Sequence, residues 1–310
     1  MKRIDIHHHI LPPAYVAKAR ERIAAVAGEF AEQVLSWTPQ RSLEAMDQAG
    51  VQMAVTSISS PGVNFGDAAA LARECNDYAA ELAARHPGRF GVFAVLPLPD
   101  VDATLKEIDR SRNAQGFGLY TNYDGAWLGD PKFAPVLKEL NRRKAVLFVH
   151  PMVCPQCTGM LAGVPDAIME YPFDTTRTIA SLLYSGAFER YPDIRYLFTH
   201  GGGALPILGH RVARYAAIGK QIAQRVSGEP MEQIKRLYFD IVSVTQPGPF
   251  AALKAMVPTT QLLFGSDYPY WPPDVTAKGL AALGLSDADR MAIEGGNARR
   301  LLKLEMEKAL

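Results

Sequence analysis

The chain of 310 residues is almost neutral, because 33 Lys and Arg stand against 32 Asp and Glu. Apolar residues make up 48% and charged residues 21%, which is typical of a globular protein and excludes a disordered or coiled-coil chain. Since no basic excess exists to hold a phosphate backbone, we expect no nucleic-acid partner.

The sequence also gives no indication of a membrane or secreted protein. No uncharged apolar stretch reaches the roughly 18 residues that a membrane helix needs, and the N-terminus has no apolar run of the signal-peptide kind. The three cysteines are an odd number without a disulfide framework. We therefore expect a cytoplasmic protein with no membrane association.

Short β-branched or aromatic runs alternate with amphipathic helical patterns along the whole chain. The runs predict strands at residues 3–7, 52–58, 90–95, 116–120, 145–149, 195–199, 237–241 and 261–264. The helical patterns lie at 39–49, 67–85, 102–112, 131–143, 175–190, 205–224, 249–256 and 286–308. Eight such units predict a (β/α)8 TIM barrel of class α/β, formed as one domain by residues 1–310. Residues 11–38 and 151–173 are predicted as extended loops after strands one and five, where they would shape a substrate site.

A histidine motif ends the first predicted strand. Residues two apart on a strand point to the same side, so His7 and His9 are expected to face the barrel mouth and His8 the surrounding helices. Two neutral imidazoles on one face supply half of a zinc site. The alternative is that the three histidines are a fragment of an expression tag, although a tag is usually longer and lies outside a strand pattern.

Three further polar residues follow predicted strand ends. They are His150, His200 and Asp267. Each alone is more simply a satisfied structural group, but the carboxyl ends of all barrel strands meet at one opening. Histidines and one aspartate that converge there can hold one divalent ion and leave a position for water or substrate.

The ordered set of motifs resembles the amidohydrolase superfamily, in the branch around aminocarboxymuconate-semialdehyde decarboxylase. The matching segments are His7-x-His9, Val149-His150-Pro151, Thr199-His200-Gly-Gly-Gly203, Gly265-Ser266-Asp267-Tyr-Pro269 and Gly296-Asn297-Ala298-Arg299. The resemblance implies that His7, His9, His150 and Asp267 bind one divalent metal. It implies that His200 contacts the metal-bound water or the substrate and transfers the proton.

The same resemblance suggests how substrate is held. Arg211 matches an arginine that reaches the substrate carboxylate of a neighbouring subunit, which implies a homodimer; the alternative is a solvated helix arginine. A second arginine of the family is missing, because no Arg or Lys lies between Arg22 and Arg41. We therefore expect a small monocarboxylic acid of the hydroxybenzoate or methylsalicylate kind. Trp37 and Tyr270 are expected either to wall a planar substrate or simply to pack in loops.

Three functions remain open at this point. The first is metal-dependent, non-oxidative decarboxylation of an aromatic or conjugated acid, with His200 and Asp267 as catalytic residues. The second is hydrolysis of a lactone or amide by the same metal-activated water, and the third is a binding barrel without catalysis.

The mixed nitrogen and oxygen ligands suit Zn²⁺, with Mn²⁺ as the alternative. Asp240, at the end of strand seven, is expected to orient His200, touch substrate or cap a loop, and the Cys154 and Cys157 pair is expected to pack within its loop.

Overall fold

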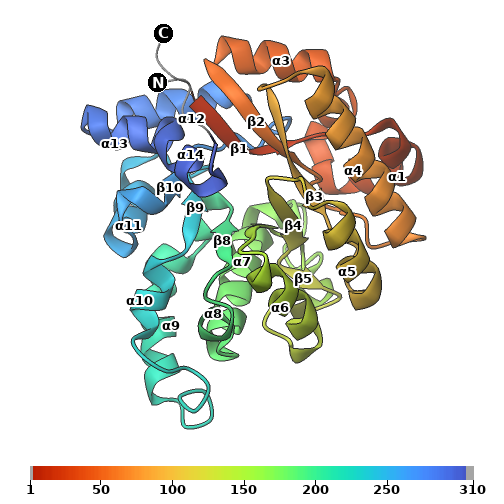
Figure 1. The fold of residues 1–310 in the computed structure, drawn as a ribbon. Coiled ribbons are helices and arrows are strands. Elements are labelled where there is room, and N and C mark those ends of the chain that lie inside the picture. Colours follow the sequence, from red (N-terminus) through yellow and green to blue (C-terminus); the bar gives the residue numbers. More distant parts are fainter. Residues whose placement is uncertain (1–2, 305–310) are drawn as a thin grey trace.

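The computed structural model describes residues 3–304, in which eight parallel strands form one sheet that closes on itself (Figure 1). In sheet order the strands are β1 (Arg3–His9), β2 (Val51–Ser57), β3 (Phe90–Val95), β4 (Gly116–Tyr120), β7 (Val146–His150), β8 (Arg195–Phe198), β9 (Tyr238–Asp240) and β10 (Leu262–Leu263). The nitrogen of Ile6 donates to the Phe264 carbonyl at 3.0 Å, and that of His9 donates to the Tyr268 carbonyl at 2.7 Å. These bonds join the first strand to the last, which confirms the predicted (β/α)8 barrel.

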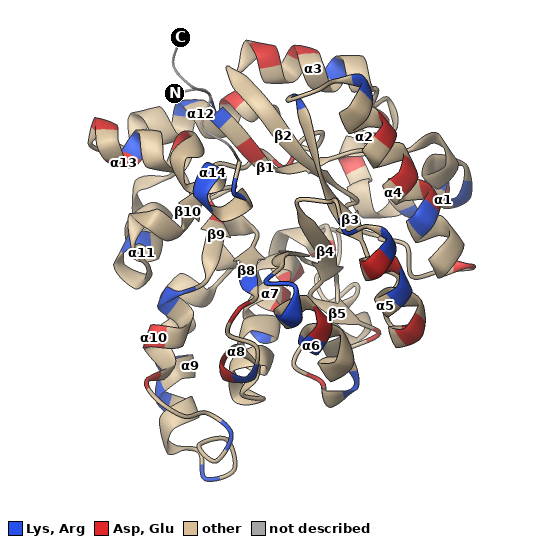
Figure 2. Ribbon diagram, viewed as in Figure 1, with Lys and Arg blue, Asp and Glu red and all other residues tan. Residues whose placement is uncertain are grey.

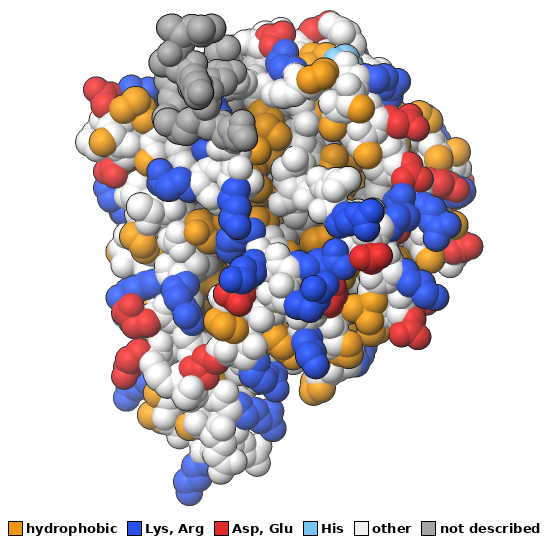
Figure 3. All heavy atoms as spheres, in the orientation of Figure 1, with side chains coloured by type: hydrophobic (Ala, Val, Ile, Leu, Met, Phe, Trp, Pro, Cys, Tyr) orange, Lys and Arg blue, Asp and Glu red, His pale blue; other side chains and the backbone are white. Residues whose placement is uncertain are grey.

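Helices surround the strands and carry most of the charged residues (Figure 2). They are α1 (Pro13–Ala27), α2 (Ala31–Leu35), α3 (Pro39–Gln48), α4 (Ala68–Arg85), α5 (Val101–Arg110), α6 (Ala134–Arg142), α7 (Asp166–Tyr184), α8 (Ala187–Arg190), α9 (Leu205–Ile218), α10 (Pro230–Lys235), α11 (Pro247–Met256), α12 (Pro273–Ala282), α13 (Asp287–Met291) and α14 (Asn297–Leu302). Basic and acidic side chains are interspersed on the face shown in Figure 3, in keeping with the nearly neutral composition.

An apolar cluster fills the inside of the barrel below its mouth. It consists of Ile4, Ile6, Val55, Phe93, Val146, Phe148, Leu197 and Leu263, with Ala298 and Leu301 of α14 packed against them. All of these side chains are buried. Because successive residues of a strand alternate between the barrel interior and the helices, strands buried on both sides are apolar almost throughout. The polar residues at the strand ends are therefore exceptions that need their own explanation.

The segment after the first strand is helical, contrary to the loop predicted for residues 11–38. It forms α1, a short 3-10 turn (Gly28–Phe30) and α2. The pattern that predicts α1 is present in the sequence: Tyr15, Ala19, Ile23 and Ala27 recur every fourth residue and are buried on one face. A proline at the first helical position and several alanines favour the helix further.

Other boundaries also differ from the predicted ones. Helix α7 starts at Asp166 within the segment predicted as a loop, includes Pro172, and ends at Tyr184. Helix α9 ends at Ile218, and the last helical region is interrupted by a π-helical turn at Ala292–Gly296. Residues 305–308 of that predicted helix lie outside the described residues. A short hairpin, β5 (Asn122–Tyr123) and β6 (Ala126–Trp127), and the helices α10 and α12 were not predicted.

Within residues 3–304, no helix is both long and apolar enough to cross a membrane. The expected cytoplasmic location stays a prediction.

Candidate metal centre and active site

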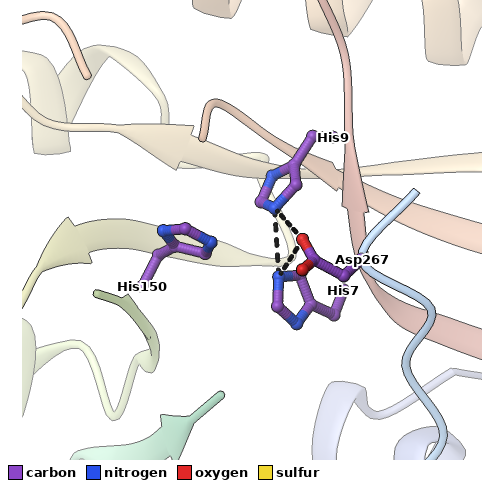
Figure 4. A group of neighbouring side chains, drawn as sticks. All are labelled: His7, His9, His150 and Asp267. Carbon is purple, nitrogen blue, oxygen red and sulfur yellow. Dashed lines mark hydrogen bonds and ion pairs between the residues drawn. The ribbon is translucent and has the colours of Figure 1, made fainter. Parts of the chain in front are cut away.

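Four side chains from three distant parts of the chain meet at the barrel mouth (Figure 4). His7 and His9 end β1, His150 ends β7, and Asp267 follows β10. One potential ligand atom from each of the four lies within 4.8 Å of the others. The histidines are at most 2% exposed and Asp267 is 9% exposed. The convergence that the sequence predicts is therefore present in the fold.

The donor atoms face one another at short range. The Nε2 atoms of His7 and His9 are 3.0 Å apart, and Asp267 Oδ1 lies 3.2 Å from the first and 3.0 Å from the second. The His150 ring lies 4.8 Å from the His9 ring and 5.3 Å from the His7 ring, measured between centroids. Figure 4 shows this ring pointing toward the other three side chains.

Partners behind the cluster fix the orientation of each imidazole. The Nδ1 atom of His7 is 2.7 Å from Asp240 Oδ2, that of His9 is 2.9 Å from Ser57 Oγ, and that of His150 is 3.0 Å from the Pro151 carbonyl. A ring that donates from Nδ1 presents the lone pair of Nε2 to the opposite side, as metal-ligating histidines do. Three such imidazoles and a carboxylate are a suitable ligand set for a divalent cation.

The acidic neighbours control the charges in this cluster. Burial opposes a charge on His7, but Asp267 and Asp240 outweigh it and raise its pKa to about 10. Burial lowers the pKa of His9 to about 4 and holds that of His150 well below its usual value. Burial also opposes the charge of Asp267, yet His7 and the hydrogen bonds of its histidine neighbours hold its pKa well below the ordinary value. The site thus attracts one positive charge at the point where the four ligand atoms meet.

His200 lies beside the cluster rather than within the metal-ligand group. It follows β8 with a φ of +53°, and its Nε2 is 3.2 Å from Asp267 Oδ2. Its backbone N–H donates to Asp240 Oδ1 at 2.8 Å. Its buried Nδ1 has no hydrogen-bond partner within residues 3–304. The contact with Asp267 therefore holds the His200 ring beside the metal-ligand group.

Asp240 has two of the roles considered for it from the sequence. One oxygen accepts from the His200 and Val242 backbone nitrogens, at 2.8 and 3.0 Å, and the other contacts His7. The carboxylate is fully buried. It therefore positions one metal-ligand histidine and the backbone of His200, and it also caps the following loop.

A second buried network lies on the helix side of β1. His8 faces α3, as expected: its Nε2 is 3.0 Å from Ser42 Oγ, and its Nδ1 is 3.0 Å from Asp5 Oδ2. Asp5 also accepts from the Ser266 backbone nitrogen at 3.0 Å and from the Ser266 hydroxyl. Trp37 donates to Ser42 Oγ at 2.9 Å. The structure thus places Trp37 in this network, behind the strand, instead of against the metal cluster.

Aromatic rings border the cluster on its open side. Tyr270, predicted either to wall the substrate or to pack in a loop, has its ring 6.2 Å from that of His9. Tyr171 of α7 packs its ring 5.9 Å from that of His150. Burial raises the pKa of the Tyr270 hydroxyl to about 12 and that of Tyr171 further, so both stay neutral. Tyr171 was missed because residues 151–173 were predicted as a loop, and no local pattern marks it as a site residue.

A small cavity adjoins His9 beneath the helical insertion. Its free volume is about 10 Å³, which is room for a single water molecule. Its lining consists of His9, Ile10, Leu11, Tyr15, Ile23, Val34, Ser59, Ser60 and Tyr270. Among these described lining residues there is no Lys or Arg. The lining therefore offers no basic side chain to pair with a carboxylate.

Two residue groups of interest lie elsewhere. Arg211 is exposed on α9, and the structure gives it no contact with the metal cluster of its own chain. Cys154 is buried and donates to Gln156 Oε1 at 2.7 Å, whereas Cys157 is partly exposed; both are free thiols. The cysteine pair therefore packs within its loop.

The barrel and its cluster define a metal-dependent (β/α)8 enzyme, and comparison with known proteins places it more narrowly. Residues 4–304 match the family described as Amidohydrolase. The chain is 38% identical over 293 residues to the decarboxylase yanB of Aspergillus niger, covering 88% of this chain and 78% of that protein. It is 32% identical over 326 residues to the 6-methylsalicylic acid decarboxylase of Penicillium expansum, covering 100% and 99%. The chain therefore belongs to the amidohydrolase family, in its branch of non-oxidative decarboxylases.

A solved structure agrees on the fold. The 2,6-dihydroxybenzoate decarboxylase complexed with 2,6-dihydroxybenzoate superimposes with a TM-score of 0.84, covering 98% of this chain and 100% of that one. Its sequence identity is 23%, so this likeness concerns the fold alone.

Proposed function

We propose that the protein is a metal-dependent carboxy-lyase that removes CO₂, without an oxidant, from a small aromatic monocarboxylic acid with a hydroxyl group beside the carboxylate. The observation that carries the proposal is the buried His7, His9, His150 and Asp267 cluster, which has the aromatic rings of Tyr171 and Tyr270 beside it. Relatives named as decarboxylases of such acids support it. We further propose that residues 1–310 form a single domain.

The metal is proposed to be Zn²⁺ or Mn²⁺, held by His7, His9, His150 and Asp267. When bound, it supplies positive charge that orients the acid and stabilises the anionic character that develops during the reaction. The side chains of Tyr171 and Tyr270 border the ring of the acid, and the buried position excludes water from it.

His200 is proposed as the proton donor. Its Nε2 lies 3.2 Å from Asp267 Oδ2, which places the ring beside the metal-ligand group. In the reaction a new C–H bond forms at the ring carbon that bears the carboxylate. The C–C bond to that carboxylate then breaks, CO₂ leaves, and the electron pair of the broken bond restores the aromatic ring. His200 takes its proton back from water.

The test uses protein reconstituted with Zn²⁺ or Mn²⁺ and a panel of 2-hydroxybenzoates. We expect CO₂ release and, in D₂O, a phenol with one deuterium at the carbon that lost the carboxylate. His200→Asn is expected to lower kcat by about 10²–10⁴-fold, the usual contribution of a general acid, with the metal content unchanged. Turnover of lactones or amides with oxygen from labelled water in the product acid, and no CO₂ from any benzoate, would replace this proposal by hydrolysis.

We also propose a homodimer in which Arg211 serves the site of the partner subunit. Arg211 is exposed on α9 between two exposed apolar residues at four-residue spacing, Ile207 and Tyr215, which are 76% and 55% exposed. Ile218 on the same helix is 65% exposed. Helical residues four apart share a face, so α9 presents an apolar strip with a cation at its centre.

Complementation tests this arrangement. Arg211→Ala and His150→Ala are each expected to be inactive, and subunit exchange between them is expected to restore activity, because mixed dimers combine an intact cluster with an intact partner arginine. Sedimentation gives the mass in parallel. A monomeric mass, or no recovery on mixing, would show that Arg211 is a solvated surface residue.

A further inference from the structure

His150 is the candidate metal ligand that the rest of the cluster holds least. The Nε2 atoms of His7 and His9 and the Oδ1 atom of Asp267 lie within 3.2 Å of one another. Within the described part of the chain, no hydrogen bond or ion pair joins His150 to these three, and the dashed lines of Figure 4 do not reach it. Its Nδ1 instead faces the Pro151 carbonyl at 3.0 Å. The orientation of its ring therefore depends on the backbone that follows it.

A buried carboxylate on α7 holds this backbone. Asp174 is fully buried, and its Oδ2 accepts from the Thr121 hydroxyl and, at 2.7 Å, from the Asn122 amide. Both donors also bind Met152, two residues after His150. Thr121 Oγ1 accepts from the Met152 nitrogen at 2.9 Å, and the Asn122 amide donates to the Met152 carbonyl at 2.8 Å. The backbone nitrogen of Thr121 donates to the His150 carbonyl at 3.0 Å, so the chain is held on both sides of the carbonyl that faces the ring.

The neighbours of Asp174 require an acceptor at this position. The Thr121 oxygen accepts from Met152, so its hydroxyl proton needs a partner of its own, and Asp174 supplies it. The other oxygen of the carboxylate, Oδ1, accepts from the Trp127 indole at 2.9 Å. An ionised carboxylate only accepts, so it can satisfy all three buried donors at once.

The same helix carries the aromatic ring beside His150. Tyr171 lies about one turn before Asp174 on α7, and its ring is 5.9 Å from the His150 ring. About one turn after Asp174, the Thr178 hydroxyl donates to the Thr121 carbonyl at 2.8 Å. Two successive turns of α7 are thus attached to the chain just after β4. The turn before them contacts the metal-ligand ring.

We propose that Asp174 is a positioning residue that fixes the His150 ring for metal binding. It acts through Thr121 and Asn122 on the backbone after His150, and through α7 on Tyr171. The inference rests on the metal-ligand assignment of the proposed function and is independent of the reaction. Partners behind a metal-ligand side chain typically contribute about 10- to 100-fold to metal affinity.

The test measures metal binding by the whole protein in the absence of substrate. Asp174→Ala and Thr121→Val are each expected to lower Zn²⁺ affinity by about tenfold in competition with a chelator, because His150 is no longer held in place. The visible absorption of bound Co²⁺ depends on ligand geometry and is expected to differ from that of the wild type in both variants. Denaturant unfolding of the metal-free proteins gives the stability of each variant separately.

Trp127→Phe is the matched control. It removes the donor to Oδ1 of the same carboxylate and leaves Thr121 and Asn122 bound to Oδ2. We expect a loss of stability similar to that of Thr121→Val, since each variant loses hydrogen bonds of one buried network. Its Zn²⁺ affinity is expected to stay within about twofold of the wild type, and its Co²⁺ absorption is expected to be unchanged.

Each outcome has a definite meaning. Unchanged Zn²⁺ affinity and Co²⁺ absorption in folded Asp174→Ala and Thr121→Val overturn the inference, and so does an equal loss of affinity in Trp127→Phe. If Asp174→Ala does not fold, Thr121→Val decides, because it keeps the carboxylate and removes only one hydroxyl group. A wild type that releases no CO₂ from any acid overturns the proposed reaction alone, whereas a wild type that binds neither metal overturns the ligand assignment and this inference with it.

Discussion

The two ends of the barrel interior contrast sharply, although the same strands build both. Deep in the barrel, Ile4 and Ile6 of β1 pack against Phe93 and Leu263, with α14 closing the base. Further along β1, His7 and His9 join the polar cluster of candidate metal ligands. The deep layer buries apolar area and stabilises the fold, whereas the candidate metal ligands lie at or just after the carboxyl ends of β1, β7 and β10. Substitutions at the two ends should therefore separate stability from activity.

The largest effect is expected at the mouth, from His150→Ala. Loss of one of four ligands should remove the metal and lower kcat/KM by at least about 10³-fold, because the metal contributes several kcal/mol to transition-state stabilisation. Metal analysis and turnover measure this. His86→Ala, at the end of α4 and outside the cluster, is the control and should retain both. An active His150→Ala variant with bound metal would contradict the ligand assignment.

The deep layer is tested by Phe93→Ala. Phe93 is 2% exposed and stacks on Phe148 with ring centroids 5.1 Å apart. Truncation should lower the free energy of unfolding by about 3–5 kcal/mol, because it removes buried area and leaves a cavity. Under conditions where the variant is folded, metal content should be unchanged. Denaturant unfolding measures the loss of stability. A variant with normal stability that has lost its metal would show that the deep layer and the metal cluster are not independent.

A smaller effect at the mouth is expected from Asp240→Asn. The carboxylate supports His7 and the backbone of His200, so its neutral isostere should weaken metal binding by about 10- to 100-fold while preserving the fold. Competition with a chelator measures the affinity. Excess metal should restore part of the activity; if it restores none and affinity is unchanged, Asp240 acts on the substrate instead.

The smallest effect is expected from Trp37→Phe. The indole donates to Ser42 behind β1, so its replacement should lower the free energy of unfolding by about 1 kcal/mol, the net value of one hydrogen bond. The ratio of kcat/KM between two acids should not change. A marked change in that ratio would instead show that Trp37 contacts the substrate.

The sequence predicts the strands well, because apolar runs mark strands that are buried on both sides. Strand ends meet at one opening, so pattern alone brings His7, His9, His150, His200 and Asp267 together as candidates. The selection of His7, His9, His150 and Asp267 as the ligands depends on the resemblance to the amidohydrolases. The segment 11–38 was predicted wrongly as a loop, although the spacing of Tyr15, Ala19 and Ile23 indicates a helix.

The site residues that the sequence does not predict depend on contacts between helices and strands far apart in the chain. Tyr171 reaches His150 only because α7 begins at Asp166 and passes over the mouth, and no residue near Tyr171 in sequence indicates this. The choice among the roles of Asp240 likewise depends on His7 and His200, which lie 233 and 40 residues away in the chain. Such pairings are set by tertiary packing rather than by local propensity.

Asp5 links β1 to the residue beside Asp267, so the first and last strands share one buried carboxylate. During synthesis the histidines of the cluster emerge long before Asp267 does. A nascent chain halted before that point lacks both the ring closure and the only anionic ligand. We therefore expect a cation to be bound by all four residues only in a chain that extends beyond Asp267.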